Sequence, residues 1–316
     1  MLPVVDDLDY ARGRVADLGA RFGVTFIKDV SAEEALTRMG ALPGTVQVRD
    51  NSPGYAAALS AGRWTLVVDP DGGTGGDHVL LEAVSAGTEA VSVFRDASAA
   101  PRFTYARDGV TTVAFDPSYP SPELTWGAEP ELLRHLMQAL GLREPAGEDD
   151  ETWRDPEAKS LVLAQRLTNA RVPADALTRP RLSARLEPWF VGGVRPGDLL
   201  SRGLRTAPLL KAAAKATPEL RRAIAADHLR RLASDLGLTG APGLDAVLDG
   251  TATAITPDSP LGRQVLTWLA EPARYGAFTT ALRGFLDPDP TVALRAALRP
   301  GHDPDAVLAT LTGHHQ

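Results

Sequence analysis

Residues 69–78 read DPDGGTGGDH and lie between a strand-like run and a helix-like run, a position where glycine-rich loops often hold phosphate. The Walker loop G-x-x-x-x-G-K-[ST] binds phosphate and Mg²⁺ through its Lys and its hydroxyl, and this segment has no Lys. Asp69, Asp71 and Asp77 instead add negative charge that repels an anion, and their spacing does not match an EF-hand. We therefore predict a turn in which Asp77 caps the following helix.

Asp77 and His78 could also form an acid–base set with Asp116, as in a hydrolase-like enzyme. A histidine at a helix N-terminus tends to stay neutral, which suits a general base. The alternative is that Asp77 is only a cap and that His78 is exposed, and neither a G-x-S-x-G nor an H-E-x-x-H motif supports catalysis. Residues that are close in the sequence need not face one another in the folded protein. We therefore rank the hydrolase-like enzyme below the interpretation of Asp77 as a helix cap.

Aromatic and arginine side chains are the best candidates for a binding surface, because this composition is typical of interaction hot spots. The alternative is packing in the core or at its rim, which is the commoner role of aromatic residues on strands. Asp69 and Asp116 lie near the ends of predicted strands, and we include both in the predicted binding surface. The binding residues that we predict are Arg49, Trp64, Asp69, Arg95, Phe103, Tyr105, Arg107, Asp116 and Trp126.

Residues 202–231 are rich in arginine and could bind nucleic acid through its phosphates. The formal net charge of the whole chain is -7, which argues against general nucleic-acid binding. The Arg pairs at 221–222 and 230–231 have acidic neighbours, so a solvated helix face is the simpler interpretation. His228 falls on the apolar stripe of this helix and is expected to be a satisfied core histidine rather than a metal ligand.

The composition of the chain limits where it works. Cysteine is absent, which removes disulfides and thiolate metal sites and fits a cytoplasmic protein. The first residues lack the apolar core of a secretory signal, and no apolar run approaches the ~18 residues that a membrane span needs. We therefore predict a cytoplasmic protein with no cofactor, no metal site and no membrane insertion.

Residues 1–143 mix strand and helix patterns and predict an α+β domain with a mixed or mainly antiparallel sheet. Asp108–Gly109 is a hairpin signal between two alternating runs, and Ser31 with Glu34 forms a capping box. Strands are expected at 24–27, 45–49, 64–68, 90–94, 102–106 and 110–115, and helices at 31–39, 53–61 and 130–140.

The acidic segment 144–157 predicts a linker, and residues 158–316 predict an all-helical domain because strand patterns end there. Helix starts in this part repeat one pattern, in which a capping residue precedes Pro at the first helical position. The four examples are Thr217–Pro218, Ser259–Pro260, Asp289–Pro290 and Asp303–Pro304.

Several short features carry a resemblance to a known family. They are Gly62-x-Trp64, Ser85-x-Gly87-Thr88, Phe115-Asp116-Pro117 and Trp126-Gly127 ahead of a helix. With these features, residues 20–190 resemble the actinobacterial proteins catalogued as domain of unknown function 6461. Family members often have Glu-Pro-Asn-Gly after the Trp strand, where this chain has Asp-Pro-Asp-Gly at 69–72. The resemblance implies a common fold unit and brings no known activity.

The favoured interpretation is a non-enzymatic protein-interaction or regulatory protein, which binds another protein in an actinobacterial defence, immunity or signalling system. It rests on the absence of a complete catalytic or cofactor motif from the sequence. The alternative is the hydrolase-like enzyme of Asp77, His78 and Asp116. Nucleic-acid binding through residues 202–231 is the weaker alternative.

Overall fold

The computed structural model of the chain divides into two compact units, Met1–Gly192 and Gly193–Gln316. It describes residues 4–50, 53–72, 76, 78–96, 99–144, 150, 154–191, 207–252, 255–298 and 303–313. No helix within these ranges is long and apolar enough to cross a membrane.

The first unit is built on one eight-stranded sheet whose neighbouring strands are all antiparallel. The strand order is β2-β8-β3-β4-β1-β5-β6-β7, so β2 and β7 form the two edges. The strands are β1 (Phe22–Lys28), β2 (Gln47–Arg49), β3 (Ala56–Ala61), β4 (Trp64–Asp69), β5 (Glu89–Asp96), β6 (Ala99–Arg107), β7 (Val110–Phe115) and β8 (Arg181–Ala184). The predicted α+β fold is confirmed.

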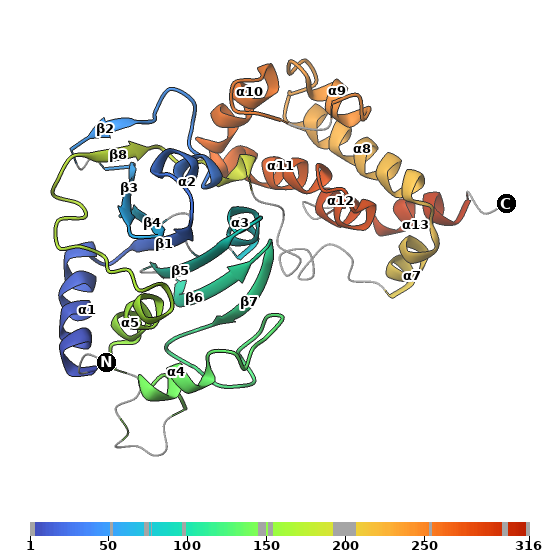
Figure 1. Cartoon of the computed structure of the whole chain (residues 1–316). Coiled ribbons are helices and arrows are strands. Elements are labelled where there is room, and N and C mark those ends of the chain that lie inside the picture. Colours follow the sequence, from blue (N-terminus) through green and yellow to red (C-terminus); the bar gives the residue numbers. More distant parts are fainter. Residues whose placement is uncertain are drawn as a thin grey trace. The chain divides into compact units, whose positions relative to one another are not determined.

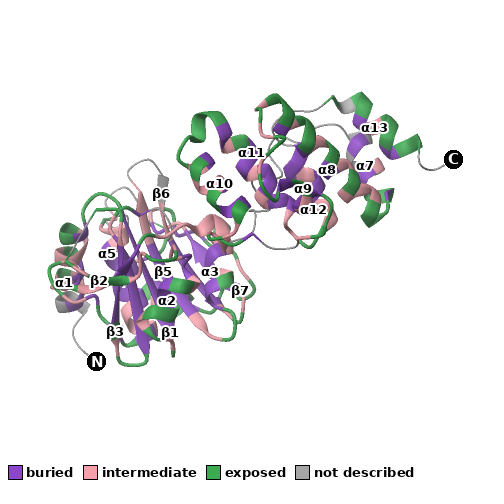
Figure 2. Cartoon of the chain, turned by 90° about the horizontal axis from the view of Figure 1, so that it is seen from above, coloured by how far each residue is buried: buried purple, intermediate pink, exposed green. Residues whose placement is uncertain are grey.

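Helices cover both faces of this sheet (Figure 1). Those on one face are α1 (Val4–Leu18), α4 (Arg134–Ala139) and α5 (Pro156–Thr168), and those on the other are α2 (Ala32–Arg38) and α3 (His78–Val84). The first face has an aromatic core, in which the rings of Phe103 and Phe115 stack 5.1 Å apart. In Figure 2 the inner strands of the sheet, such as β1, β3 and β5, are coloured mostly as buried. The sheet is therefore the middle of three layers.

Strand β3 stands where we predicted a helix over residues 53–61. Its run AAALSA has high helix propensity, but it lies between β4 and β8, and Ala56–Leu59 are buried. The two ladders provide partners for its backbone groups, and the small side chains pack on the sheet. The helix prediction was wrong because tertiary pairing overrode local propensity.

Local signals in the first unit produced the predicted cap and turn. Ser31 accepts a hydrogen bond from the N–H of Glu34 at 3.1 Å and caps α2. Asp108 and Gly109 both have positive φ, 49° and 80°, as the tight turn between β6 and β7 requires. These short-range patterns were sufficient to place both elements.

The first unit extends past the acidic segment 144–157 that we predicted as a linker. Helix α5 packs into the aromatic core, and β8 pairs with β2 and β3. Residues 158–192, which we assigned to the helical domain, therefore belong to the first unit. Acidic charge did not mark the boundary, because Asp155 and Glu157 form ion pairs with Arg12 and Arg95.

The second unit is helical over the part of it that the structure describes. Its helices are α7 (Ala207–Lys215), α8 (Pro218–Asp235), α9 (Leu244–Leu248), α10 (Pro260–Leu269), α11 (Pro272–Phe285), α12 (Pro290–Leu298) and α13 (Pro304–Gly313). Thr217 accepts a hydrogen bond from the N–H of Leu220 at 3.2 Å, and Ser259 accepts one from Gly262 at 3.0 Å. A capping side chain followed by Pro therefore starts these helices, as predicted.

Candidate functional site

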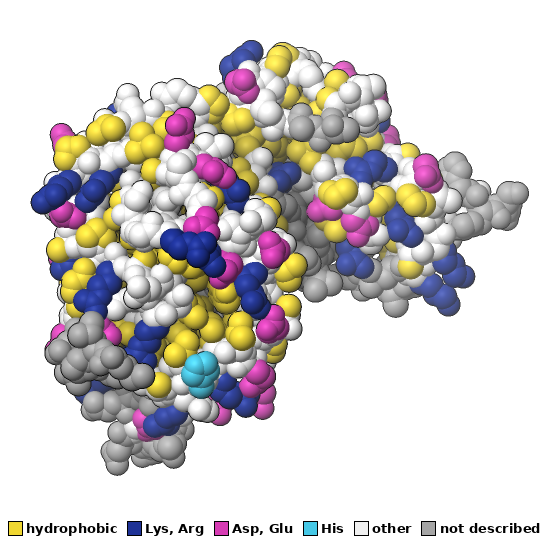
Figure 3. All heavy atoms as spheres, in the orientation of Figure 1, with side chains coloured by type: hydrophobic (Ala, Val, Ile, Leu, Met, Phe, Trp, Pro, Cys, Tyr) yellow, Lys and Arg dark blue, Asp and Glu magenta, His cyan; other side chains and the backbone are white. Residues whose placement is uncertain are grey.

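Exposed hydrophobic side chains concentrate in one stretch of the first unit. Five of the six large hydrophobic residues that are exposed among the described residues lie there: Val110, Tyr119, Leu124, Trp126 and Leu132. The sixth, Val48, lies on the opposite edge strand, β2. Figure 3 shows hydrophobic side chains among charged ones over α4 and the loop before it. We call the five residues the 110–132 surface.

The 110–132 surface is anchored on the edge strand β7. The backbone of Trp126 exchanges two hydrogen bonds with that of Ala114, at 2.8 and 2.9 Å, and the N–H of Glu129 donates to the carbonyl of Thr112 at 2.9 Å. Gly127 lies between them with a φ of 128°, and a Cβ there would come within 2.4 Å of the Thr112 carbonyl oxygen. Only glycine lets the loop approach β7 this closely, so the loop covers the sheet edge.

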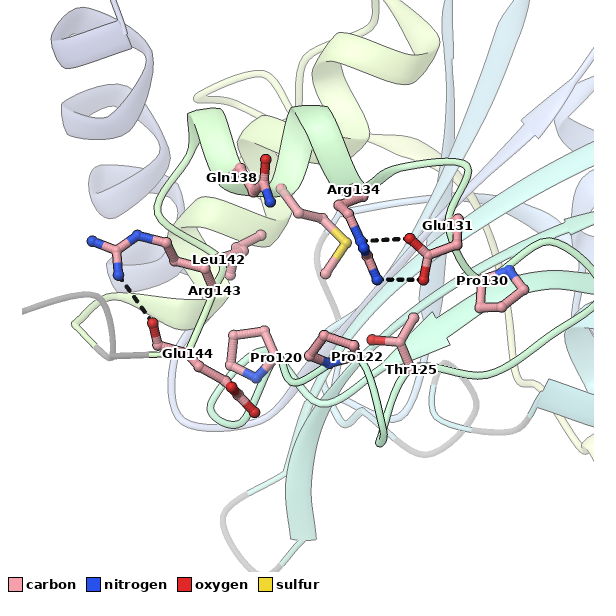
Figure 4. A pocket seen from close by; sticks show the side chains of 11 residues that line it. Pro120, Pro122, Thr125, Pro130, Glu131, Arg134, Gln138, Leu142, Arg143 and Glu144 are labelled. Atoms are coloured by element: carbon pink, nitrogen blue, oxygen red, sulfur yellow. Dashed lines mark hydrogen bonds and ion pairs between the residues drawn. The ribbon is translucent and has the colours of Figure 1, made fainter. Parts of the chain in front are cut away.

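A pocket of about 240 Å³ opens between this loop and α4 (Figure 4). Pro120 and Pro122 line it on the loop side. The guanidinium of Arg134 meets the carboxylate of Glu131 at 2.5 Å on one side of it, and Arg143 lies on another. Small-molecule pockets usually enclose roughly 300–1,000 Å³. The smaller volume here suits a group of the size of a single amino-acid side chain.

Charged side chains next to the 110–132 surface are already paired within the first unit. Arg107 forms an ion pair with Glu129, and Arg143 forms one with Asp150 at 2.7 Å. Paired charges of this kind leave little net field to attract a charged ligand. The apolar side chains therefore set the binding character of this surface.

Trp126 is the predicted binding residue that lies in this surface, and 43% of it is exposed. Its ring meets that of His78, the first residue of α3, edge-on with the centroids 4.9 Å apart. The contact holds the indole against the sheet edge while part of it stays exposed. Asp116 lies directly after β7, where its carboxylate accepts a hydrogen bond from the N–H of Ser118 at 2.8 Å.

The other predicted aromatic residues belong to the core. Trp64, Phe103 and Tyr105 lie on the aromatic face of the sheet and are 7%, 0% and 8% exposed. For these three, the packing alternative describes the structure, because strands bury their aromatic side chains against α1, α4 and α5.

Tyr105 also anchors a charged cluster at one end of the sheet. Its hydroxyl donates to Glu89 at 2.8 Å, and the Nζ of Lys28 lies 2.5 Å from the other carboxylate oxygen. Burial raises the pKa of Tyr105, and the hydrogen bond to Glu89 raises it further. Burial also acts to raise the pKa of Glu89, but hydrogen bonds from Lys28 and Tyr105 outweigh it, so this pKa is lowered. Arg107 lies over the Tyr105 ring, 5.6 Å from its centroid, so these two predicted residues do meet.

The remaining predicted arginines lie elsewhere on the sheet. Arg49 stacks on Tyr55 at 4.3 Å beside the β2 edge. Arg95 forms an ion pair with Glu157, near the start of α5, at 3.4 Å. Because β2 and β7 are opposite edges, the structure distributes the predicted residues over several places instead of one surface.

Two aspartate side chains accept backbone hydrogen bonds in and next to the described part of the glycine-rich turn. The buried carboxylate of Asp69 accepts a hydrogen bond from the N–H of Asp71 at 3.1 Å, and that of Asp71 accepts one from Gly54 at 2.7 Å. Both contacts serve the turn itself. Residues 73–75 and Asp77 lie outside the described residues, so the predicted cap and the Asp77–His78–Asp116 set remain predictions.

The arginine pairs of α8 have partners inside the second unit. Arg221 donates to two carbonyl oxygens near the end of α7, at 2.7 and 2.9 Å. Arg222 donates to three carbonyl oxygens at and just after the end of α11, at 2.9, 2.8 and 3.1 Å. Arg230 and Arg231 form ion pairs with aspartates. Residues 202–206 of the predicted basic segment lie outside the described residues.

Sequence reasoning missed four of the five residues of this surface, namely Val110, Tyr119, Leu124 and Leu132. For Tyr119 and Leu124 a signal was present, because the segment 117–130 is rich in proline and keeps apolar residues between the prolines. Proline disfavours the interior of a helix or strand, and a connecting segment without regular structure runs over the surface. Such a loop deserves more weight as a binding surface than aromatic residues on strands.

Comparisons place the first unit in a family. A family model described as a family of unknown function matches residues 1–186, more than half of the chain. The matched region corresponds to the first unit and includes all eight strands. No curated protein and no solved structure matches the chain. Among the described residues, no group of three or more His, Asp or Glu side chains could hold a metal ion.

Proposed function

The chain belongs to this family, DUF6461, and from the geometry of the first unit we propose that it is a non-enzymatic protein-interaction protein. Its 110–132 surface binds a different protein through apolar contacts. One apolar side chain of that partner enters the pocket between the loop and α4.

The concentration of exposed hydrophobic residues in one stretch of the chain, from β7 to the segment before α4, carries this proposal. Exposed apolar side chains that gather in one place, with polar residues around them, mark protein-interaction sites. Tyr119 is 69% exposed and Leu124 is 58% exposed, so most of each side chain is accessible to a partner. Backbone pairing with β7 fixes the loop in advance, which lowers the entropy that binding would cost.

The local charges favour a protein over other ligands. The pairing of Arg107, Arg134 and Arg143 with carboxylates removes the free positive charge that a nucleic acid or an acidic metabolite would need. An interface with a polar rim and an aromatic anchor such as Trp126 instead matches the composition of protein hot spots.

The nucleic-acid alternative finds less support. Arg221 and Arg222 are committed to helix ends, and Arg230 and Arg231 are paired with Asp249 and Asp227. Binding phosphate would require these contacts to break. A role in an actinobacterial defence, immunity or signalling system stays a prediction.

Site-specific photo-crosslinking in the host cell tests the proposal. A benzophenone amino acid is introduced at Leu124 in one variant and at Val48 in another, since both positions are exposed hydrophobic residues at opposite sides of the sheet. We expect a discrete crosslinked species from position 124 that contains a second, different protein. We expect no such species from position 48.

Three results would contradict the proposal. They are no crosslinked product at position 124, the same products at both positions, or a product that contains two copies of this chain. The additional substitution Trp126→Ser should reduce the specific crosslink at position 124 severalfold, because it removes the aromatic anchor. Far-UV circular dichroism of each variant checks that the sheet is retained.

A further inference from the structure

Helix α8 of the second unit has two apolar stripes, and only one of them is fully covered. Ala225, Leu229 and Ala233 are buried in the contact with α11 and α12. Leu220, Ile224, His228 and Leu232 recur every fourth residue along an adjacent face and are only half-buried. A stripe at this spacing is the contact surface that a helix offers to a neighbouring helix.

This second stripe forms the floor of a groove with a volume of about 480 Å³. Val307 and Thr310 of α13 line it on the opposite side. The groove follows α8 from Leu220 to Asp235, which corresponds to about 22 Å at ~1.5 Å per residue. That length accommodates about four turns of a second helix.

The rim of the groove is acidic. Asp227, Asp235 and Asp303 line it, together with one base, Arg231, whose guanidinium already pairs with Asp227. The carboxylate of Asp303 also accepts hydrogen bonds from the first N–H groups of α13 and keeps its negative charge while it does so. An acidic rim repels nucleic acid and attracts basic side chains that flank an apolar stripe. The acidic rim and the length of the groove therefore both favour a helix that carries basic side chains beside an apolar stripe.

We propose that the groove between α8 and α13 binds an amphipathic helix of a partner protein, with apolar residues at a three-to-four-residue spacing and Lys or Arg beside them. The apolar face of that helix lies on Leu220, Ile224 and Leu232, and its basic residues meet Asp235 and Asp303. This is the helix-in-groove mode of recognition. The inference does not depend on the 110–132 surface, which lies in the other unit.

A designed peptide provides the test with the full chain. The probe is a fluorescent peptide of about 16 residues, with Leu at helical spacing and Lys on both sides of the Leu stripe. Fluorescence anisotropy at low salt measures its binding. A peptide of the same composition in scrambled order, and one with Glu in place of Lys, are the ligand controls. We expect both controls to bind at least tenfold more weakly.

Two variants with the same change of charge separate the groove from general electrostatics. Asp235→Lys removes an acid of the rim, whereas Asp245→Lys changes an exposed acid of α9 outside the groove. We expect the first to weaken binding of the Lys peptide about tenfold and the second to change it less than twofold.

Ile224→Glu tests the apolar floor, and it leaves the buried stripe of α8 in place. We expect it to abolish measurable binding while the helical circular dichroism signal is unchanged. Equal weakening by Asp235→Lys and Asp245→Lys, equal binding of the scrambled peptide, or no binding to the unmodified protein would each overturn the proposal. These outcomes are independent of crosslinking at Leu124, so the two proposals can fail separately.

Discussion

Both units contain arginines that pair with surface carboxylates, but two adjacent arginines of α8 in the second unit bind helix ends instead. In the second unit, Arg221 and Arg222 donate to backbone carbonyls at the ends of α7 and α11. In the first unit, Arg63 and Arg107 pair with carboxylates at the surface. The physical reason is that each helix leaves its last four carbonyls without an intrahelical partner, whereas the ladders of a sheet pair the carbonyls of its inner strands.

The difference shows that arginine-rich sequence does not by itself predict a basic binding surface. A guanidinium that donates to several carbonyls at a helix end complements the helix dipole and is part of the fold. An exposed ion pair contributes little to stability. Arg38 of the first unit does both. It donates to the carbonyls of Val84, the last residue of α3, and of Ala86, and it also pairs with Glu34.

The largest expected effect is that of Arg222→Met. The substitution keeps an apolar stem but removes hydrogen bonds to the end of α11, so we expect the free energy of unfolding of the second unit to fall by about 2–3 kcal/mol. Because a chain with two units need not unfold in one step, hydrogen exchange of peptides from α8 and α11 is the appropriate measurement.

Arg230→Met is the matched control in the same helix. Arg230 is exposed and pairs with Asp249, so its loss should change exchange in α8 and α11 far less. An equal loss of protection in the two variants would break the comparison between carbonyl-bound and carboxylate-bound arginine.

A smaller effect is expected for Tyr105→Phe in the first unit. It removes the hydroxyl that donates to Glu89, and we expect a loss of about 1 kcal/mol at pH 7. The pKa of Glu89 is lowered in the folded state, so its contribution is present above its unfolded pKa and is lost as the pH falls through the folded pKa. The difference between Tyr105→Phe and the unmodified protein should therefore shrink as the pH falls below about 4.

Denaturant unfolding at several pH values, followed by exchange of β5 and β6 peptides, checks this dependence. Tyr55→Phe is the control, because Tyr55 contacts Arg49 through its ring and not through the Glu89 cluster. A loss for Tyr105→Phe that is the same at pH 3 and pH 7 would show that packing, and not the hydrogen bond to ionised Glu89, is responsible.

The smallest effect is expected for Arg63→Met. Arg63 pairs with Asp29, which lowers the pKa of Asp29 through the hydrogen bond, but both side chains are exposed. Solvent and salt screen such a pair, so we expect no measurable change in Tm at physiological salt. A clear decrease in Tm would show that exposed carboxylate pairs in the first unit matter as much as the carbonyl contacts in the second.

Local patterns in the sequence were sufficient where neighbouring residues supply all the necessary groups. Ser31 caps α2 with the N–H of Glu34, and Asp108–Gly109 turns between β6 and β7, because both motifs close within a few residues. The same holds for Thr217 and Ser259 in the second unit. Family membership of the first unit was also evident from short motifs.

Patterns of this kind failed where the partner is remote in the chain. The run AAALSA became a strand because β8 and β4 lie on either side of it, and β8 comes more than a hundred residues later. The candidate surface was missed for a related reason. Burial of Trp64, Phe103 and Tyr105 depends on the helices that cover their face of the sheet, and so does the exposure of Tyr119 and Leu124 beyond it.

The sequence by itself determined the α+β character of the first part, the helical character of the second, and most caps and turns, because these depend on interactions between near neighbours. Only the tertiary structure decided the extent of the first unit, the role of Arg221 and Arg222, and which apolar residues remain exposed. Those features depend on burial and on backbone partners that are distant in the chain. How far an apolar side chain is exposed depends on how the helices and the sheet pack together. Exposure in the 110–132 surface and partial exposure along α8 are the observations that carry the two proposed binding surfaces.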